Sequence, residues 1–324
     1  MTIGYALLPE NQCQPLTSLE DLAKIWPRND VFVWVDLESP SDDDLQQLSQ
    51  IIALDNEALD DCLHGEQQPR VDEFKSYIFL VLYGLHGLKE QAELDPHKLA
   101  AFCGNRFLIT VGRAPLLSVR QVRARCGRHP ETLLARGVDV VLFEIIDTMV
   151  DHYLRVIDRY EDRLEDLEER SFEMDVDEEV LEQAAEVRRD LLDLRRLAVA
   201  QRQLLQPVAR GGYNFVSESL GQQFSHVRDH LSQVVDSVDS LRETIISIRD
   251  NYHAGLTRRT NEIMKVLTLY AGIMLPLTLI AGIYGMNLPL WPPSDQPASF
   301  WGVLAVMVII AGFLLIYFRR RKWL

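Results

Sequence analysis

Four acidic side chains recur at a strict spacing of seven residues: Asp229, Asp236, Glu243 and Asp250. In a helix this spacing puts all four on one side. A row of carboxylates attracts cations, and Mg²⁺ in particular prefers oxygen ligands. The same row is equally typical of the solvated side of an ordinary amphipathic helix, so both interpretations remain open from these residues alone.

The stripe that contains these acids continues, in steps of three and four residues, into an apolar segment. Its further positions are Ala254, Thr257, Asn261, Met264, Thr268, Ala271, Leu275, Thr278, Gly282 and Gly285. Polar groups at membrane depth are tolerated where they face a protein interior or a water-filled cavity. The continuation therefore favours an ion path, provided that the helices tilt or supercoil, because a straight helix drifts by about 20° per heptad.

Two histidines lie on either side of the first of these acids. His226 and His230 are four residues apart, so a helix presents them on one side, next to Asp229. Imidazole suits Zn²⁺, Co²⁺ or Ni²⁺ better than Mg²⁺. The candidate metal-binding residues are thus His226, Asp229, His230, Asp236, Glu243 and Asp250. The alternative is that the histidines are two ordinary surface residues.

Two segments lack any charged residue, 266–286 and 300–318. As helices they would be roughly 28 to 32 Å long, which matches the hydrocarbon core of a bilayer. Lys and Arg flank both segments on the outside of the pair, whereas the connection 287–299 has neither. The positive-inside rule then predicts a two-helix transmembrane hairpin with both termini in the cytoplasm.

The chain of 324 residues carries a formal charge of −15, and because Arg319 to Lys322 contribute +4 and Asp295 contributes −1, residues 1–265 carry −18. This acid surplus argues against a nucleic-acid partner. No signal peptide is visible, and the four widely spaced cysteines fit a reducing cytosol. Phosphate loops, nucleophile elbows and zinc-protease motifs are absent from the sequence, which argues against an enzyme.

The elements that position the stripe divide the chain into successive regions. Residues 1–130 predict a cytosolic α/β domain, with strands at 31–37 and 77–85, a helix starting at Ser41, and a hairpin turning at Gly104-Asn105. Residues 131–212 predict an antiparallel helical pair that ends at Pro207 and Gly211-Gly212.

Residues 213–286 predict a stalk helix that continues into the first membrane span at about 262–286. Its apolar seam is formed by Leu231, Val234, Val238, Leu241, Ile245, Ile248 and Tyr252. The external loop 287–299, the second span 300–318 and the basic tail 319–324 complete the chain.

The segment "TNEIMKVLTLYAGIMLPLTLIAGIYGMN" (260–287) resembles the first membrane helix of the CorA family of magnesium and cobalt transport proteins. The second span, the terminal "YFRRRKWL" and, more loosely, "QQPRVDEFKSYIFLVL" and "CGNRFLITVGRAPL" extend this resemblance over most of the chain. It implies a funnel-shaped homopentamer in the bacterial inner membrane, without ATP hydrolysis, whose only bound groups are transported and regulatory divalent cations such as Mg²⁺ or Zn²⁺.

The resemblance also implies roles for individual residues. Gly285, Met286 and Asn287 would form the external selectivity filter. The pore-facing positions would be Asn261, Met264, Leu267, Leu275 and Thr278, to which the polar stripe adds Thr268, and Met264 with Leu267 would form a hydrophobic constriction. Asp250 would form an acidic ring at the inner end, and Arg319, Arg320, Arg321 and Lys322 a basic collar.

Two departures from the family pattern affect the expected metal. The loop "LPLWPPSDQPAS" carries only Asp295 where members commonly have a glutamate, and the stalk places histidines in the region that senses magnesium. A zinc transporter of the related ZntB branch is therefore the alternative. A two-span signalling protein with a coiled-coil stalk is the second alternative, although a relay helix would not need a polar stripe through its span.

Overall fold

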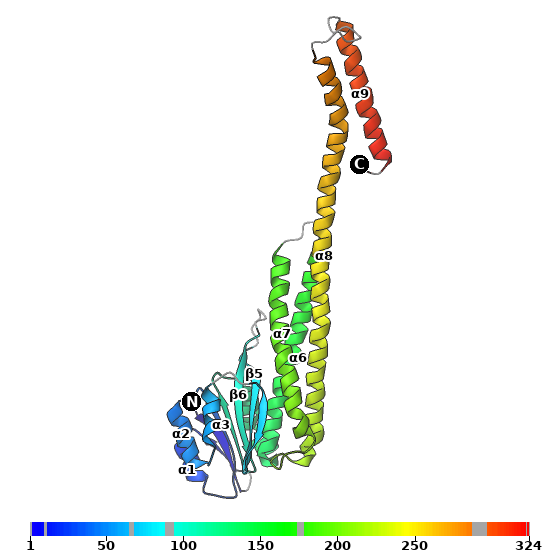
Figure 1. Ribbon diagram of the computed structural model, residues 1–324. Coiled ribbons are helices and arrows are strands. Elements are labelled where there is room, and N and C mark those ends of the chain that lie inside the picture. The colour runs from blue at the N-terminus through cyan, green and yellow to red at the C-terminus, as the bar shows by residue number, and fades with distance from the viewer. Residues whose placement is uncertain are drawn as a thin grey trace. The chain divides into compact units, whose positions relative to one another are not determined.

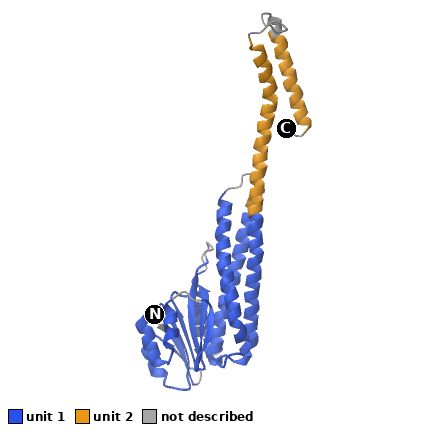
Figure 2. Ribbon diagram, in the orientation of Figure 1, with its two compact units in different colours: residues 1–169, 178–248 blue, residues 170–177, 249–324 orange. Residues whose placement is uncertain are grey.

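The computed structural model describes residues 2–9, 12–64, 68–87, 94–173, 178–286, 297–321 and 323. They form two compact units, residues 1–169 with 178–248, and residues 170–177 with 249–324 (Figure 2). The longest helix, α8 (Glu218–Tyr284), contributes to both units. The finer division into functional regions given above stays a prediction.

The first unit is built on a sheet of seven strands in the order β2-β1-β3-β7-β6-β5-β4. These are β1 (Thr2–Leu8), β2 (Gln12–Leu16), β3 (Phe32–Glu38), β4 (Arg70–Glu73), β5 (Tyr77–Leu85), β6 (Pro96–Gly104) and β7 (Phe107–Gly112). Strands β3 and β7 pair in parallel and the other neighbours pair antiparallel. The predicted α/β class is confirmed.

Helices cover both sides of this sheet (Figure 1). On one side lie α1 (Leu19–Ile25), α2 (Asp42–Ile51) and α3 (Asn56–Leu63), whose apolar residues share one buried cluster with β3, β5, β6 and β7. The predicted start of α2 is confirmed, because Ser41 caps it and receives a hydrogen bond from the Asp44 backbone N–H, while the Asp44 carboxylate accepts one from the Ser41 N–H at 2.8 Å.

The other helices follow β7 in the chain. They are α4 (Leu117–Arg128), α5 (Pro130–Leu133), a 3₁₀ turn at Leu134–Arg136, α6 (Val138–Ser171) and α7 (Glu179–Ala209). Figure 1 shows α6 and α7 on the side of the sheet opposite to α1, α2 and α3. The chain then enters α8, and α9 (Pro297–Arg320) closes the described fold.

Two predicted boundaries are wrong. The hairpin turns at Asn105-Arg106, because Gly104 still belongs to β6 and pairs with Tyr77 of β5. Helix α7 runs past Pro207 to Ala209, since a proline in the last turn removes only one backbone hydrogen bond. The Pro207 carbonyl itself accepts hydrogen bonds from the Arg210 and Gly212 N–H groups, which closes the helix end.

Within the first unit, α8 packs through its predicted seam. Its buried residues include Leu231, Val234, Val238, Leu241, Ile245 and Ile248. Arg195 of α7 donates two hydrogen bonds to Asp239 of α8, at 2.9 and 3.1 Å, and Ser247 of α8 donates one to Glu168 of α6 at 3.0 Å. These contacts fix which side of α8 faces its neighbours and which side stays exposed.

A closed set of buried hydrogen bonds joins the sheet to α6 and α7. The Tyr153 hydroxyl of α6 donates to the Tyr83 carbonyl of β5 and accepts from Gln201 Nε2 of α7 at 2.8 Å. Gln201 Oε1 in turn accepts from the Tyr83 N–H at 3.4 Å. Tyr153 and Gln201 are almost completely buried, so their polar groups depend on one another.

We predict that Tyr153→Phe lowers the free energy of unfolding of the first unit by about 1–3 kcal/mol, because it leaves the Tyr83 carbonyl and the Gln201 amide without this partner. Thermal unfolding of the detergent-solubilised protein, followed by circular dichroism, measures the change. Tyr252→Phe, at a half-buried position on α8, is the matched control and should leave the transition in place. Equal transitions for both variants would contradict the role given to Tyr153.

Candidate functional site

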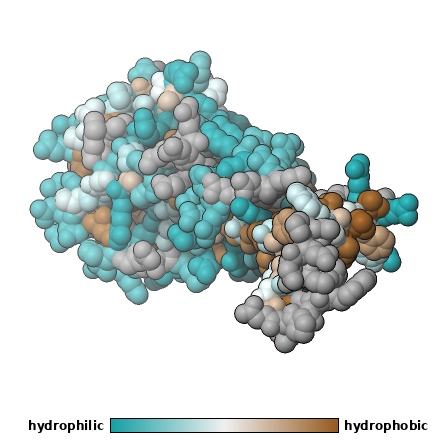
Figure 3. Space-filling view, turned by 90° about the horizontal axis from the view of Figure 1, so that it is seen from above, coloured by the Kyte–Doolittle hydropathy of each residue, from teal (hydrophilic) through white to brown (hydrophobic). Residues whose placement is uncertain are grey.

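The second unit contains the membrane candidates. The part of α8 that follows residue 249 and helix α9 are long and apolar enough to cross a membrane, and neither apolar window is buried within the structure. In Figure 3 residues of these two helices are largely brown, whereas most of the other described surface is teal. Exposed apolar helices of this length fit a lipid surrounding far better than water.

Helix α9 covers only one side of α8. The partly buried positions of α8 in this span are Leu269, Ala271, Gly272, Ile273, Pro276, Leu277, Ile280 and Tyr284. Apart from Ala271, they fall within one side of a helix with 3.6 residues per turn. The approach is tight at Gly272, where an added Cβ would lie 3.2 Å from Cζ of Phe318. Small residues allow this kind of close helix packing in membranes.

The predicted polar stripe lies on the opposite side of α8. Its exposed members in this unit are Asp250, Ala254, Thr257, Asn261, Met264, Thr268, Leu275, Thr278, Gly282 and Gly285, and Leu267 beside them is exposed as well. Met264 is 53% and Leu275 is 68% exposed. The Thr268 hydroxyl donates to the Met264 carbonyl at 2.7 Å, which satisfies it within the helix. Within the described residues, this chain offers no second helix to cover the stripe.

The C-terminal end of α8 leads into the predicted filter. The helix ends at Tyr284, after which the Gly285 N–H donates to the Ala281 carbonyl at 2.9 Å and the Met286 N–H to the Ile283 carbonyl at 3.2 Å. Gly285 and Met286 are exposed. Asn287, the third predicted filter residue, lies outside the described residues, as does Lys322 of the predicted collar.

The predicted stalk acids are all exposed. Asp229 contacts Arg228 at 3.2 Å and Asp250 contacts Arg249 at 3.1 Å, while Asp236 and Glu243 also face solvent. Such exposed pairs between sequence neighbours add little stability. In the part of the chain that the structure describes, no group of three or more His, Cys, Asp or Glu side chains is placed to hold a metal ion. A stalk metal site would thus need ligands from elsewhere.

The two predicted histidine ligands lie in different surroundings. His226 is exposed, whereas His230 is half-buried and its Nδ1 atom is buried without a hydrogen-bond partner. Asp147 of α6 interacts with His230, and burial, followed by the charges of Asp151 and Glu144, raises the pKa of Asp147. These three acids of α6 are not among the predicted ligands, although their spacing of three and four residues places them on one side of a helix.

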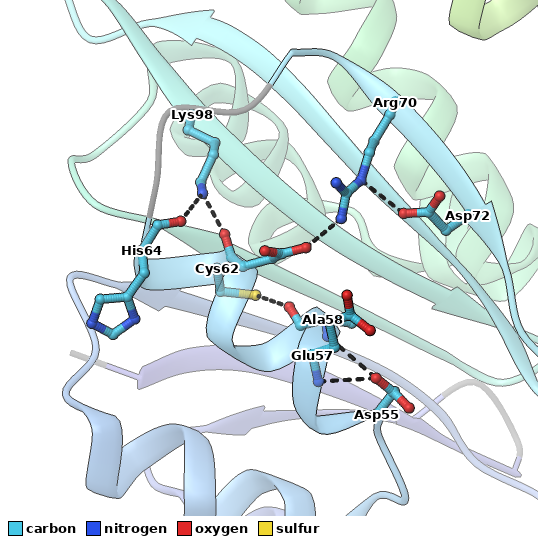
Figure 4. A network of polar contacts seen from close by, with 9 residues as sticks. Asp55, Glu57, Ala58, Cys62, His64, Arg70, Asp72 and Lys98 are labelled. Carbon is cyan, nitrogen blue, oxygen red and sulfur yellow. Dashed lines mark hydrogen bonds and ion pairs between the residues drawn. The ribbon is translucent and has the colours of Figure 1, made fainter.

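Two acids of the α/β region, Asp61 and Asp72, are paired with one arginine. Arg70 of β4 pairs with Asp61 of α3 and, at 2.8 Å, with Asp72 (Figure 4). Lys98 of β6 donates to the backbone carbonyls of Asp61 and His64, which ties α3 to the sheet (Figure 4). Beside Arg70 lies a pocket of about 270 Å³ whose lining includes Glu57, Asp61 and Asp72. These contacts hold residues 68–74 against α3.

At the other end of the chain, Arg319, Arg320 and Arg321 follow the apolar part of α9 and are exposed. Cations at a helix C-terminus are stabilised by the helix dipole. The collar residues that the structure describes are therefore placed to present charge rather than to pair within the helix.

Comparison with known proteins gives concordant matches. The family described as CorA-like Mg2+ transporter protein matches residues 29–320. The cobalt/magnesium transport protein CorA of Thermotoga maritima is 29% identical over 282 residues, 87% of this chain and 80% of that protein. The zinc transport protein ZntB of Pectobacterium carotovorum subsp. carotovorum is 24% identical over 250 residues, 75% of this chain and 74% of that protein.

Among solved structures, the complete structure of the CorA magnesium transporter from Methanocaldococcus jannaschii has a TM-score of 0.87 at 24% identity, covering 100% of this chain and 99% of that one. An α/β region, long helices and two C-terminal apolar helices thus define the fold class, which this structure shares. Because the family match spans most of the sequence, the chain belongs to the CorA-like Mg²⁺ transporter family, which confirms the resemblance.

We predict that Gly272→Leu disrupts the packing of α9 on α8, because the larger side chain would collide with Phe318. The expected cost is about 1–3 kcal/mol, measured as a lower thermal transition of the purified protein in detergent. Gly302→Leu is the matched control, since an added Cβ at Gly302 meets no other atom within 4 Å. A transition lowered equally in both variants would argue against the α8–α9 contact.

Proposed function

We propose that this protein transports divalent metal cations through a central path lined by the first membrane span of several copies. The observation that carries the proposal is the uncovered polar stripe on the side of α8 opposite to α9. Two spans cannot enclose a pore, and polar groups at membrane depth require protein or water beside them. Further copies of α8 satisfy both needs, and family membership supports a pentamer.

The filter assignment follows from the chemistry of the motif. Gly285 and Met286 lie where α8 ends, and Asn287 follows directly in the sequence. A ring of amide oxygens from several copies would accept hydrogen bonds from the water shell of a hydrated cation. Because these oxygens are neutral, the cation would bind weakly enough to leave again. The path continues inward through Thr278, Leu275 and Thr268.

The inner part of the path would hold a gate. Met264 and Leu267 are exposed apolar side chains, and a ring of them forms a constriction that dewets. Asn261 and Asp250 follow on the inner side, where carboxylates concentrate cations. The collar Arg319–Lys322 would surround this end. This placement agrees with the positive-inside rule, which puts both termini in the cytoplasm. The protein would then lie in the inner membrane of a bacterium.

Cytosolic metal would regulate opening through the stalk. The candidate ligands are Asp229, Asp236, Glu243, Asp250, His226 and His230. No cluster of ligands forms within the described residues of one chain, so a bound Mg²⁺ or Zn²⁺ would join ligands from adjacent copies and favour the closed assembly. Loss of the metal would loosen the contact between copies.

The transported metal is Mg²⁺ in the first instance, with Co²⁺ and Ni²⁺ as related cargo. Zn²⁺ is the second candidate, and the observation that favours it is the pair His226 and His230, whose imidazoles suit a borderline metal better than Mg²⁺. The relatives bear both names, since one is a cobalt/magnesium and another a zinc transport protein. Competition uptake across the four ions separates the two.

We predict that Asn287→Ala reduces divalent-cation uptake into proteoliposomes by more than about tenfold, because the ring of amide oxygens is lost. Uptake is followed with an internal metal-sensitive dye, and size-exclusion chromatography checks that assembly persists. Gln222→Ala, which removes an exposed amide elsewhere on α8, is the control and should transport normally. Preserved selective uptake in Asn287→Ala would refute the filter, and no flux of any divalent ion in the natural protein would refute transport.

We also predict that Mg²⁺ or Zn²⁺ slows proteolysis of the purified assembly and that the double variant His226→Ala/Asp229→Ala loses this protection, because bound metal joins neighbouring stalks. Limited digestion followed by gel electrophoresis gives the readout. Asp193→Ala removes an exposed acid from α7 and should keep the protection. Digestion rates that metal leaves unchanged in the natural protein would count against metal-dependent gating.

A further inference from the structure

A groove of about 1030 Å³ lies between α4 and α6 in the first unit. Its lining comes from one side of each helix and consists of Leu117, Arg120, Gln121, Ala124, Arg125, Arg128, Thr148, Asp151, Leu154 and Arg155. Small-molecule sites in proteins have volumes of roughly 300–1,000 Å³, so the groove is large enough for a metabolite. The predicted filter, pore, stalk and collar residues that the structure describes lie outside its lining.

The groove is positively charged, whereas the region that contains it is negatively charged. Residues 1–265 carry −18, yet four arginines and one acid line the groove. Arg125 pairs with Glu144 at 2.9 Å and donates to Thr148 at 3.0 Å. Arg120, Arg128 and Arg155 are exposed, and within the described residues none of these three makes an ion pair.

Two acids of α6 outside the lining, Glu144 and Asp147, interact with Arg125, whereas Gln121 and His152 add no negative charge. Gln121 Oε1 lies 3.3 Å from Nε2 of the fully buried His152, whose Nδ1 has no hydrogen-bond partner. Burial, followed by the charge of Arg155, lowers the pKa of His152 to about 4, so this histidine is neutral at physiological pH. Helix α4 also begins at Leu117 without a side-chain cap, which leaves the positive end of its dipole at the groove.

The spread of the arginines indicates the shape of the ligand. Arg120 and Arg128 are eight residues apart on α4, which is roughly 12 Å along the helix axis. A single phosphate is too short to bridge them, whereas a chain of phosphates can contact both and reach Arg155 on α6. Arginine is well suited to this recognition because its planar group binds phosphate oxygens through paired hydrogen bonds.

We propose that the groove between α4 and α6 binds a polyphosphate anion, either inorganic or the phosphate chain of a nucleoside triphosphate, through Arg120, Arg128 and Arg155. Asp151 opposes the ligand with one negative charge that the arginines outnumber. Among the described residues, no aromatic side chain lines the groove, so the phosphates rather than a stacked nucleobase provide the recognition. This site is independent of the proposed ion path.

Isothermal titration of the full-length protein in detergent, with EDTA present, tests the proposal with tripolyphosphate, ATP and orthophosphate as probes. Tripolyphosphate and ATP should bind with similar affinity and orthophosphate at least about tenfold more weakly, since it reaches fewer arginines. ATP binding that is much tighter than tripolyphosphate binding would locate the recognition in the base and overturn the proposal.

Removing a positive or a negative side chain from the groove should change the affinity for tripolyphosphate in opposite directions. Arg120→Gln/Arg155→Gln should weaken tripolyphosphate binding at least about tenfold, whereas Asp151→Asn should tighten it by removing repulsion. Arg196→Gln, which alters an exposed arginine of α7, is the matched control and should bind like the natural protein. Circular dichroism confirms that each variant is folded.

Several outcomes would overturn this assignment. One is that no polyphosphate gives a heat of binding at millimolar concentration. Another is that the double arginine variant binds tripolyphosphate as tightly as the natural protein. In a third outcome, the natural protein binds no polyphosphate and the Arg120→Glu substitution dissociates the assembly. The groove would then be a contact surface between copies of the chain.

Discussion

Helix α8 has to satisfy two different surroundings with one continuous run of 67 residues. In the first unit its seam from Leu231 to Ile248 is buried against neighbouring helices of the same chain. In the second unit α9 is the available neighbour, and it covers one side. A helix in lipid must place its polar side against protein or water. The uncovered stripe with Thr268 and Thr278 therefore supports the proposed association with other copies.

The side on which that stripe lies is set by polar contacts far from it. Arg195 holds Asp239, and Glu168 holds Ser247, so α8 cannot rotate about its axis without breaking charged or partly buried hydrogen bonds. The buried set formed by Tyr83, Tyr153 and Gln201 fixes α6 and α7 to the sheet in the same way. Apolar contacts tolerate sliding better than directional hydrogen bonds, so these few polar contacts specify the rotation.

The sequence predicts those features whose signals are local. Strand β5 has the predicted bounds because its β-branched and aromatic run is bounded by turn residues, and α2 starts at a capping box that four residues encode. The turn after β6 is displaced by one residue because strand pairing with Tyr77 holds Gly104. The arginine groove escaped the sequence analysis since α4 and α6 meet only in the folded chain. The filter rests on the motif alone, because Asn287 lies outside the described residues.

Negative and positive side chains gather on different helices of this chain. Carboxylates occupy the exposed side of α8, where they attract cations, whereas unpaired arginines gather between α4 and α6, where they attract anions. Replacing a carboxylate by a neutral imidazole in such a row reduces the Coulomb attraction for every cation equally, but it adds a ligand that only the borderline metals use well. If the stalk binds metal as proposed, His226 and His230 would therefore favour Zn²⁺ over Mg²⁺ at that site.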